Sequence, residues 1–121
     1  MLLARALQMF MPGKPQVWYL DLFAGENDLE AVQRGGEAGH KEINRTNLSK
    51  AEIEKRMQWP IVQEQLKLLK MRNACPAFGV DAELQIEQPE KHILRLTWHK
   101  QDGKAALEAN LLTYDFNITL S

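Results

Sequence analysis

Cysteine is almost absent from the sequence, and this scarcity excludes disulfide-stabilised folds. The single cysteine, Cys75, has no second thiol in the chain with which to form a disulfide. Its neighbours Asn73, Ala74, Pro76 and Ala77 include no cation that would lower the pKa of the thiol. We therefore expect Cys75 to be a buried structural residue, in a protein of a reducing compartment such as the cytoplasm.

The sequence also lacks an excess of charge and a membrane-length apolar run. It has 15 basic and 16 acidic residues, and the resulting net charge of -1 gives no electrostatic attraction to nucleic acid or anionic membranes. The apolar start, MLLARALQMFM, is interrupted by Arg5. It is about half of the ~20 residues that a membrane-spanning helix needs. We expect no nucleic-acid partner and no membrane partner, and a first helix that packs on another element.

Familiar patterns of metal binding and nucleophilic catalysis are missing. The three histidines, His40, His92 and His99, are far apart and show no spacing typical of metal ligands. The glycines match neither the dinucleotide-binding pattern nor the phosphate-binding loop, and no G-x-S-x-G motif is present. Ser49 is explained by helix capping, because Glu52 follows it in a capping box. The residues therefore predict no metal site and no serine nucleophile.

The first part of the chain, up to about residue 78, alternates predicted helices and one strand. Helices are predicted over residues 2–11, 28–34, 50–58 and 60–73. The run PQVWYLDLF is nearly unbroken in apolar residues and predicts a parallel strand over 15–22, buried on both faces. Trp18 and Tyr19 on this strand, and Trp59 and Trp98 elsewhere, are expected to lie in the core rather than to stack on sugars. One such strand cannot form a sheet alone, so the α/β part resembles the end of a larger protein.

From residue 80 onward apolar and polar residues alternate, which predicts four antiparallel strands, each with one solvent-exposed face. In AELQIEQ, Ala82, Leu84 and Ile86 alternate with polar residues. The segments HILRLTWHK and AALEANLL flank QDG, a hairpin-turn signal, and YDFNITL alternates again from Tyr114 onward. We predict an α+β protein with domains 1–79 and 80–121, divided near Gly79.

A polar, glycine-rich stretch follows the predicted strand and is the candidate site. Loops at the carboxyl ends of parallel strands commonly build binding sites. The polar residues in or beside this stretch are Asp21, Glu26, Asn27, Asp28, Arg34, His40, Lys41, Asn44 and Arg45. Together they suit a polyhydroxylated or anionic ligand, although their spacing alone favours a solvated loop. The apolar Ile43 directly before Asn44 and Arg45 favours a segment anchored inward.

Three stretches in series resemble the C-terminal part of the sucrose phosphorylases, a group within the α-amylase superfamily. They are PGKPQVWYLDLFAGENDLEAV at 12–32, EINR at 42–45 and PIVQEQLKLLKMRNACPAFG at 60–79. The resemblance implies that residues 1–79 are the tail of a (β/α)8 barrel, with the active-site loop over 24–58. It implies that residues 80–121 are the small antiparallel β-domain that follows the barrel.

The resemblance also implies a role for the INR motif. Arg45 matches an arginine that lines the glucose subsite in this family, and Asn44 is assigned with it. The substrates implied are a glucoside and phosphate, with no cofactor. The nucleophilic aspartate, the acid/base glutamate and a supporting aspartate have no match here, so we assign no catalytic residue. Thr46, Asn47 and Leu48 replace the histidine and aromatic residues that often follow INR, which leaves the glucoside open.

Two hypotheses follow from these observations. The chain is a C-terminal fragment of a sucrose-phosphorylase-like enzyme, inactive alone because one subsite arginine cannot replace nucleophile and acid/base. Alternatively, it is a non-catalytic module that binds carbohydrate or protein through its β-domain. The first hypothesis leaves the edges of strand 15–22 unpaired, so we expect self-association.

Overall fold

The computed structural model describes residues 1–121, with the side chain of Ala38 excepted. The chain forms two compact units: one combines Met1–Pro15 with Lys67–Ser121, and the other is Gln16–Leu66. The domain boundary predicted near Gly79 stays a prediction. Among the described residues, no helix is long and apolar enough to cross a membrane.

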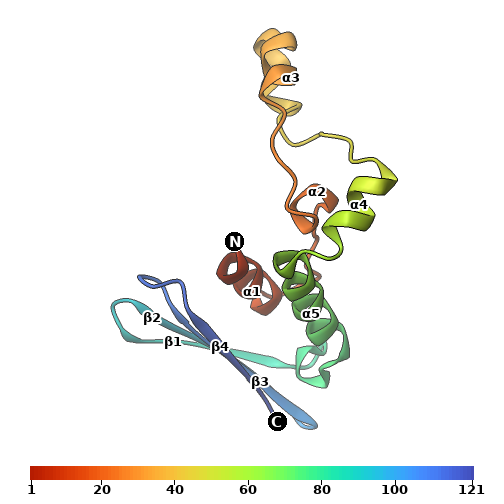
Figure 1. Ribbon diagram of the computed structural model, residues 1–121. Helices are drawn as coiled ribbons and strands as arrows, with labels where there is room; N and C mark the ends of the chain where they lie inside the picture. Colours follow the sequence, from red (N-terminus) through yellow and green to blue (C-terminus); the bar gives the residue numbers. More distant parts are fainter. The chain divides into compact units, whose positions relative to one another are not determined.

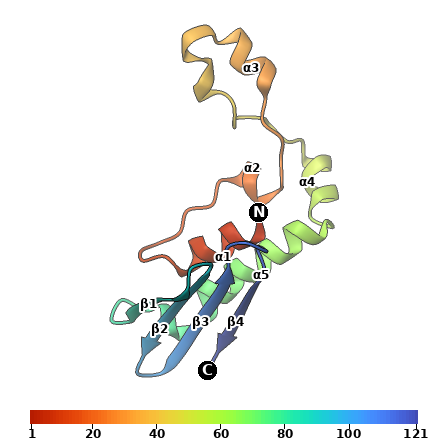
Figure 2. The same cartoon turned by 90° about the vertical axis from the view of Figure 1, so that its left-hand side faces the viewer.

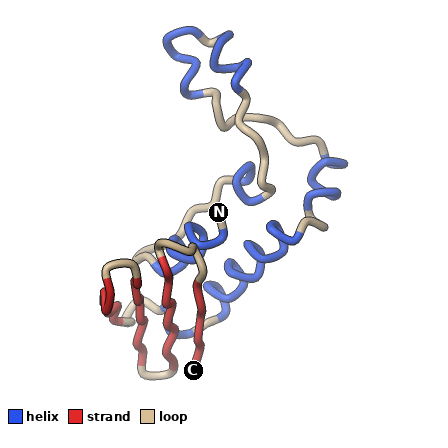
Figure 3. The backbone as a smooth tube through the Cα atoms, turned by 60° about the vertical axis from the view of Figure 1, so that its left-hand side comes forward, coloured by secondary structure: helices blue, strands red, loops and turns tan.

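The first unit contains a four-stranded antiparallel sheet, as the period-two pattern predicts (Figure 1). Its strands are β1 (Glu83–Glu90), β2 (Ile93–Lys100), β3 (Gly103–Asn110) and β4 (Phe116–Leu120), in the order β1-β2-β3-β4. Each strand therefore pairs with its neighbour in sequence, which Figure 3 shows as a simple meander. Lys100 pairs with Gly103, so the predicted QDG signal contributes a two-residue turn, Gln101–Asp102.

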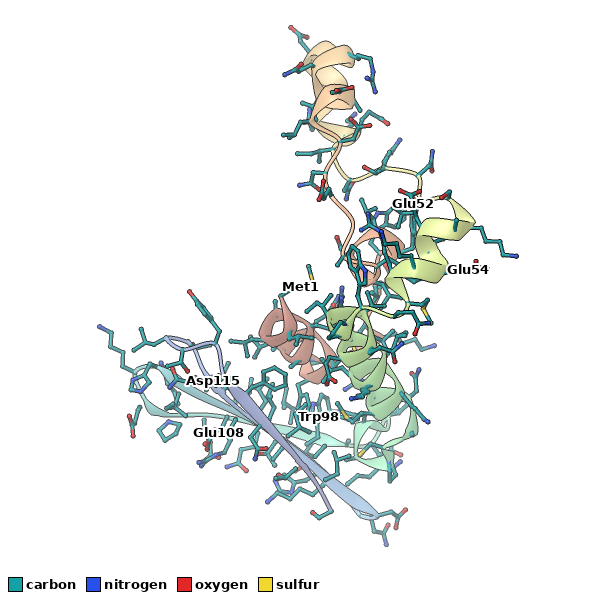
Figure 4. All side chains as sticks on the ribbon, viewed as in Figure 1. Met1, Glu52, Glu54, Trp98, Glu108 and Asp115 are labelled. Carbon is teal, nitrogen blue, oxygen red and sulfur yellow. The ribbon has the colours of Figure 1, made fainter. Side chains whose placement is uncertain are left out.

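The alternation of side chains separates a covered face of this sheet from a polar one. The register places Leu84, Leu96, Trp98, Ala105, Leu107 and Ile118 on the same face. Helix α1 (Leu2–Phe10) packs on this face and buries Ala6, Met9 and Phe10 against it (Figure 2). In Figure 4 Trp98 points to the α1 side, where its indole Nε1 donates to the carbonyl oxygen of Phe10 at 2.8 Å.

Several apolar residues of the predicted strands are exposed instead of buried, among them Ile86, Tyr114 and Leu120. Ile86 is 63% exposed because β1 is an edge strand, with a neighbour on one side only and a bulge before Glu90. Tyr114 lies outside β4: its φ is +64°, and its backbone N–H donates to the carbonyl oxygen of Asn110 in the turn after β3. The alternation of apolar and polar residues therefore covers more of the sequence than the hydrogen-bonded strands do, since β4 begins only at Phe116.

The strand predicted over 15–22 is wrong. Residues 14–18 form neither strand nor helix, and Tyr19–Leu22 form the short helix α2. No described strand lies beside this segment, so its backbone N–H groups have no ladder to join and instead bond locally: Leu22 N–H to Trp18 O and Phe23 N–H to Tyr19 O. Trp18 is consequently 47% exposed rather than part of the core, although Leu20 is buried. The unpaired strand edges on which we based self-association do not occur.

The predicted helices are present with small changes of boundary. They are α3 (Leu29–Arg34), α4 (Lys50–Arg56) and α5 (Pro60–Ala74), and two short 3-10 turns, η1 (Gly36–Lys41) and η2 (Pro76–Phe78), add to them. Cys75, between α5 and η2, is half-buried rather than fully buried. Its position in a connection rather than inside an element explains the difference.

Candidate functional site

The candidate site lies in the unit Gln16–Leu66 and is built on the end of α2. The last carbonyl groups of a helix lack partners within it, and here two side chains supply donors. Gln65 donates through Nε2 to the carbonyl oxygens of Asp21 and Leu22, at 3.2 and 3.1 Å. Arg56 donates through Nη1 to the carbonyl oxygens of Phe23 and Ala24, at 3.2 and 2.8 Å. The chain that leaves α2 is thus held in place.

Residues 43–46, Ile-Asn-Arg-Thr, are tied to this same region, and we call them the clamped segment. Asp28 N–H donates to the carbonyl oxygen of Ile43, and Trp18 Nε1–H donates to that of Asn44, both at 2.8 Å. Thr46 makes two further hydrogen bonds. Its carbonyl oxygen accepts from the Tyr19 hydroxyl, and its own hydroxyl donates to the carbonyl oxygen of Glu26 at 2.9 Å. Four hydrogen bonds therefore fix the backbone on both sides of Arg45.

The chain between Asp28 and the clamped segment has its own local order. The carboxylate of Asp28 accepts from Ala31 N–H at 2.8 Å and caps α3, while Arg34 lies 3.4 Å from Glu30. Gly39 packs so closely that a Cβ there would lie 1.9 Å from the carbonyl oxygen of Val32. This glycine is therefore explained by a close backbone approach rather than by a phosphate-binding loop.

Arg45 presents its guanidinium group at the surface of the clamped segment. Its side chain is 61% exposed, and Nη1 lies 3.1 Å from Oε1 of Glu42. Such an exposed pair three residues apart contributes little to stability and dissociates easily. Asn44 is exposed, and the bond described for it uses its carbonyl group rather than its side chain. The backbone is therefore fixed, and the guanidinium group it carries can form bidentate hydrogen bonds with a carboxylate, a phosphate or a pair of hydroxyl oxygens.

Three of the other polar residues predicted for the site have partners elsewhere than at Arg45. Asp28 and Arg34 serve α3, and His40 Nδ1 lies 3.1 Å from Glu37 O within η1. Within the described part of the chain, no group of three or more histidine, cysteine, aspartate or glutamate side chains could hold a metal ion. Ile43 is half-buried. Its carbonyl bond to Asp28 adds the inward anchor that the sequence suggested.

Sequence reasoning missed the two side chains that hold the end of α2. Gln65 is fully buried, and it falls between Val62 and Leu69 on the apolar stripe of α5. A glutamine inside an apolar stripe is itself a signal, since a buried amide requires partners. Arg56 gave no comparable signal, because a basic residue in the last turn of a helix is common.

A capping box begins α4 directly after the clamped segment, as predicted. Ser49 Oγ accepts from Glu52 N–H at 3.3 Å, and the carboxylate of Glu52 accepts from Ser49 N–H at 2.8 Å. The bonds from the Ser49 hydroxyl and backbone lower the pKa of Glu52 from its ordinary value of 4.5. In Figure 4 Glu52 lies at the start of α4, away from Glu54 further along the helix.

We expect the start of α4 to loosen in acid. Because the folded state lowers the pKa of Glu52, the stabilisation is fully present above pH 4.5 and is lost as the pH falls through the lowered folded-state value. NMR titration of the Glu52 carboxyl and of Ser49 N–H would follow this loss. The variant Glu52→Gln should remove the pH dependence at Ser49, and an unchanged titration in that variant would contradict the assignment.

We expect Tyr19→Phe to loosen the clamped segment without unfolding the chain. The variant deletes the hydroxyl that donates to Thr46 O and should lower the local opening free energy by about 1 kcal/mol. Hydrogen exchange at Asp28 and Arg45, whose N–H groups bond Ile43 O and Glu42 O, would measure it. Tyr114→Phe is the matched control, since Tyr114 is 72% exposed. Equal exchange in both variants would show that the tyrosine bond does not hold the segment.

Comparison with known proteins identifies relatives that are much longer than this chain. This chain is 52% identical over 117 residues to the sucrose 6(F)-phosphate phosphorylase of Ilumatobacter coccineus. The matched residues make up 97% of this chain and 22% of the relative. This chain is 36% identical over 119 residues to the sucrose phosphorylase of Streptococcus mutans, covering 97% of this chain and 24% of the relative. No protein-family model matches the chain.

A solved structure is similar over almost the same extent. The crystal structure of sucrose 6F-phosphate phosphorylase from Thermoanaerobacter thermosaccharolyticum has a TM-score of 0.87 and 45% identity, covering 98% of this chain and 23% of that one. The matched part in these relatives is their C-terminal region. The chain therefore spans less than a quarter of the length of the relatives it matches.

Proposed function

We propose that the chain is the C-terminal part of a glucosyl-transferring phosphorylase, because it matches the C-terminal region of the sucrose phosphorylases. The whole protein would move glucose reversibly between sucrose, or a related glucoside, and phosphate. Residues 1–79 would complete its (β/α)8 barrel, and residues 80–121 would form its terminal β-domain. The identity of 52% over nearly the whole chain is the observation that carries this proposal.

In this proposal the clamped segment supplies one part of the glucose subsite. Arg45 is exposed and weakly paired, whereas the backbone around it is fixed by four hydrogen bonds. This arrangement suits a sugar subsite. Because the backbone is already ordered, binding of a sugar by the exposed guanidinium group would cost little further conformational entropy. Asn44 would stand beside Arg45 at this subsite. The nucleophile and acid/base would come from the remainder of the protein.

The test is reconstitution. The chain would be mixed or co-expressed with the sucrose 6(F)-phosphate phosphorylase of Ilumatobacter coccineus from which the matched C-terminal region has been deleted. We expect phosphate-dependent release of glucose 1-phosphate from the mixture and none from the chain alone. Sucrose and sucrose 6(F)-phosphate should both be supplied, because relatives of both names match. An inactive mixture, alongside an active one made with the relative's own region, would reject the proposal.

The alternative, a carbohydrate-binding β-module, receives less support. The polar face of the sheet carries Glu83, Gln85, Arg95 and Thr97, which the register places together, and Thr97 among them is buried. Arg95 Nε donates to Glu108 Oε2 at 3.1 Å, and this pairing raises the pKa of Arg95. Sugar-binding faces usually offer aromatic rings, and this face does not present them at these positions. NMR titration with glucose would favour the module if shifts appeared on 83–120 and not at Arg45.

Self-association remains part of the proposal on a different basis from the unpaired strand. Several apolar side chains are strongly exposed, among them Val80, Ile86 and Leu112 at 101%, 63% and 70%. Single exposed apolar side chains are common on monomeric proteins, so the association that we propose is weak and confined to high concentration. Sedimentation velocity over a concentration series should show the mean mass rising, and a single monomeric species throughout would contradict it.

A further inference from the structure

Arg72 is a half-buried cation with no acidic partner among the described residues. Its guanidinium carbon lies 4.2 Å from the ring centre of Phe78 and 5.6 Å from that of Trp98. Nη2 donates to the carbonyl oxygen of Gly13 at 2.9 Å, whereas Nη1 is buried with no hydrogen-bond partner among the described residues. Burial lowers the pKa of Arg72 from its ordinary value. Stacking therefore holds the side chain, but its charge is not neutralised.

A cavity of about 540 Å³ lies directly against this arginine. Its walls are Pro12, Gly13, Lys14, Arg72, Phe78, Gly79, Val80, Ala82 and Trp98. All of these residues belong to one compact unit. The volume suffices for a small organic ligand or a hydrated ion. Arg72, Phe78 and Trp98 are thus both a stacked cluster and one wall of a ligand-sized space.

Two lysines add positive charge to the same cavity. Lys14 is one of the lining residues and is exposed. Lys100, on β2, does not line the cavity but lies beside one of its walls, since a Cβ at Gly79 would lie only 2.4 Å from Lys100 Nζ. No carboxylate lies within salt-bridge distance of Lys14, Arg72 or Lys100 in the described part of the chain. Asp81, exposed between two lining residues, is not itself part of the wall.

We propose that this cavity is a binding site for a phosphate group, presented either as inorganic phosphate or as a sugar phosphate. Two cations of the wall and a third beside it, none within salt-bridge distance of a carboxylate, favour a dianion, and the apolar part of the wall strengthens the attraction. Lys14 and Lys100 are the ammonium donors at the rim, and Arg72 is the fixed positive charge of the wall. The structural role of Arg72 explains its stacking, but it does not explain why Lys14 lies in the same wall and Lys100 beside it, both without a carboxylate partner. The inference does not depend on the proposed glucosyl transfer.

The experiment is an NMR titration of the 121-residue chain with inorganic phosphate and, separately, with glucose 1-phosphate. Sodium chloride at equal ionic strength corrects for general screening. We expect saturable shifts at Gly13, Lys14, Gly79 and the Trp98 indole N–H, with a dissociation constant of about 1 mM or below. Tighter binding of the ester would assign the site to a sugar phosphate, and equal binding would assign it to the phosphate group alone.

Variants separate binding from folding. Lys14→Met combined with Lys100→Met should weaken binding by about tenfold or more, because two of the three charges are lost. Lys70→Met, an exposed lysine on α5 that does not line the cavity, should bind as the unchanged chain does. Arg72→Lys retains the charge and should bind more weakly than the parent chain yet more tightly than the double variant. Absence of saturable shifts with both ligands, or equal affinity in the double variant and Lys70→Met, would overturn the proposal.

Discussion

Replacing Trp98 with alanine is expected to lower the free energy of unfolding by about 3–5 kcal/mol, enough to unfold much of a marginally stable chain. Trp98 is only 7% exposed and lies on the sheet face that α1 covers. Its indole packs 6.1 Å from the Phe78 ring and bonds the last residue of α1, Phe10. The substitution therefore removes packing, a stacking partner of Arg72 and the bond to Phe10 together.

Two further variants separate these contributions. Trp98→Phe keeps a ring in place but leaves the Phe10 carbonyl without its donor, so we expect a loss of about 1–3 kcal/mol. Trp18→Ala is the matched control in the other unit: Trp18 is 47% exposed, and its loss should cost about 1 kcal/mol. Urea denaturation monitored by circular dichroism measures all three. A cost for Trp98→Ala no larger than that for Trp18→Ala would show that the α1–sheet contact is not the main stabilising one.

The β-sheet could be predicted from the sequence because its information is local. Alternation in LQIEQ and ILRLTWHK determines which side chains face α1, and the QDG turn determines the register of the central hairpin. The capping box of Ser49 and Glu52 was equally local, because both partners lie within one helical turn. Errors occurred at Ile86, because β1 is an edge strand, and at Tyr114, because it lies in the turn after β3; alternation predicts neither feature.

The strand predicted over 15–22 failed because its evidence was not local. An apolar run is compatible with a buried strand only if neighbouring strands exist, and no described strand lies beside it. The same run instead gave Trp18 and Tyr19 donors that reach 26 and 27 residues ahead, to Asn44 and Thr46. Contacts at that separation leave no periodic trace in one sequence. For this reason Arg45 was found through a family resemblance, while the bonds that position it required the structure.

Replacing Arg45 with alanine in the reconstituted phosphorylase is expected to lower kcat/KM by about 100-fold or more, equivalent to about 3 kcal/mol of transition-state stabilisation. The reason is chemical: a guanidinium group at a sugar subsite offers charge-assisted hydrogen bonds that no neighbouring residue of the clamped segment can replace. The stability of the folded state should be unaffected. The ion pair with Glu42 is exposed, and none of the hydrogen bonds that fix residues 43–46 involves the side chain of Arg45.

This combination of large activity loss and unchanged stability distinguishes a subsite residue from a structural one. Lys50→Ala is the matched control, because Lys50 is also an exposed cation in a surface pair, 3.8 Å from Glu54, and starts the next helix. Its kcat/KM and melting temperature should both match those of the parent protein. Arg45→Lys should be more active than Arg45→Ala, since it keeps the positive charge, but less active than the parent protein, because lysine cannot form bidentate hydrogen bonds. If Arg45→Ala were as active as Lys50→Ala, the arginine would be surface charge ahead of a helix cap and the glucose subsite would lie elsewhere.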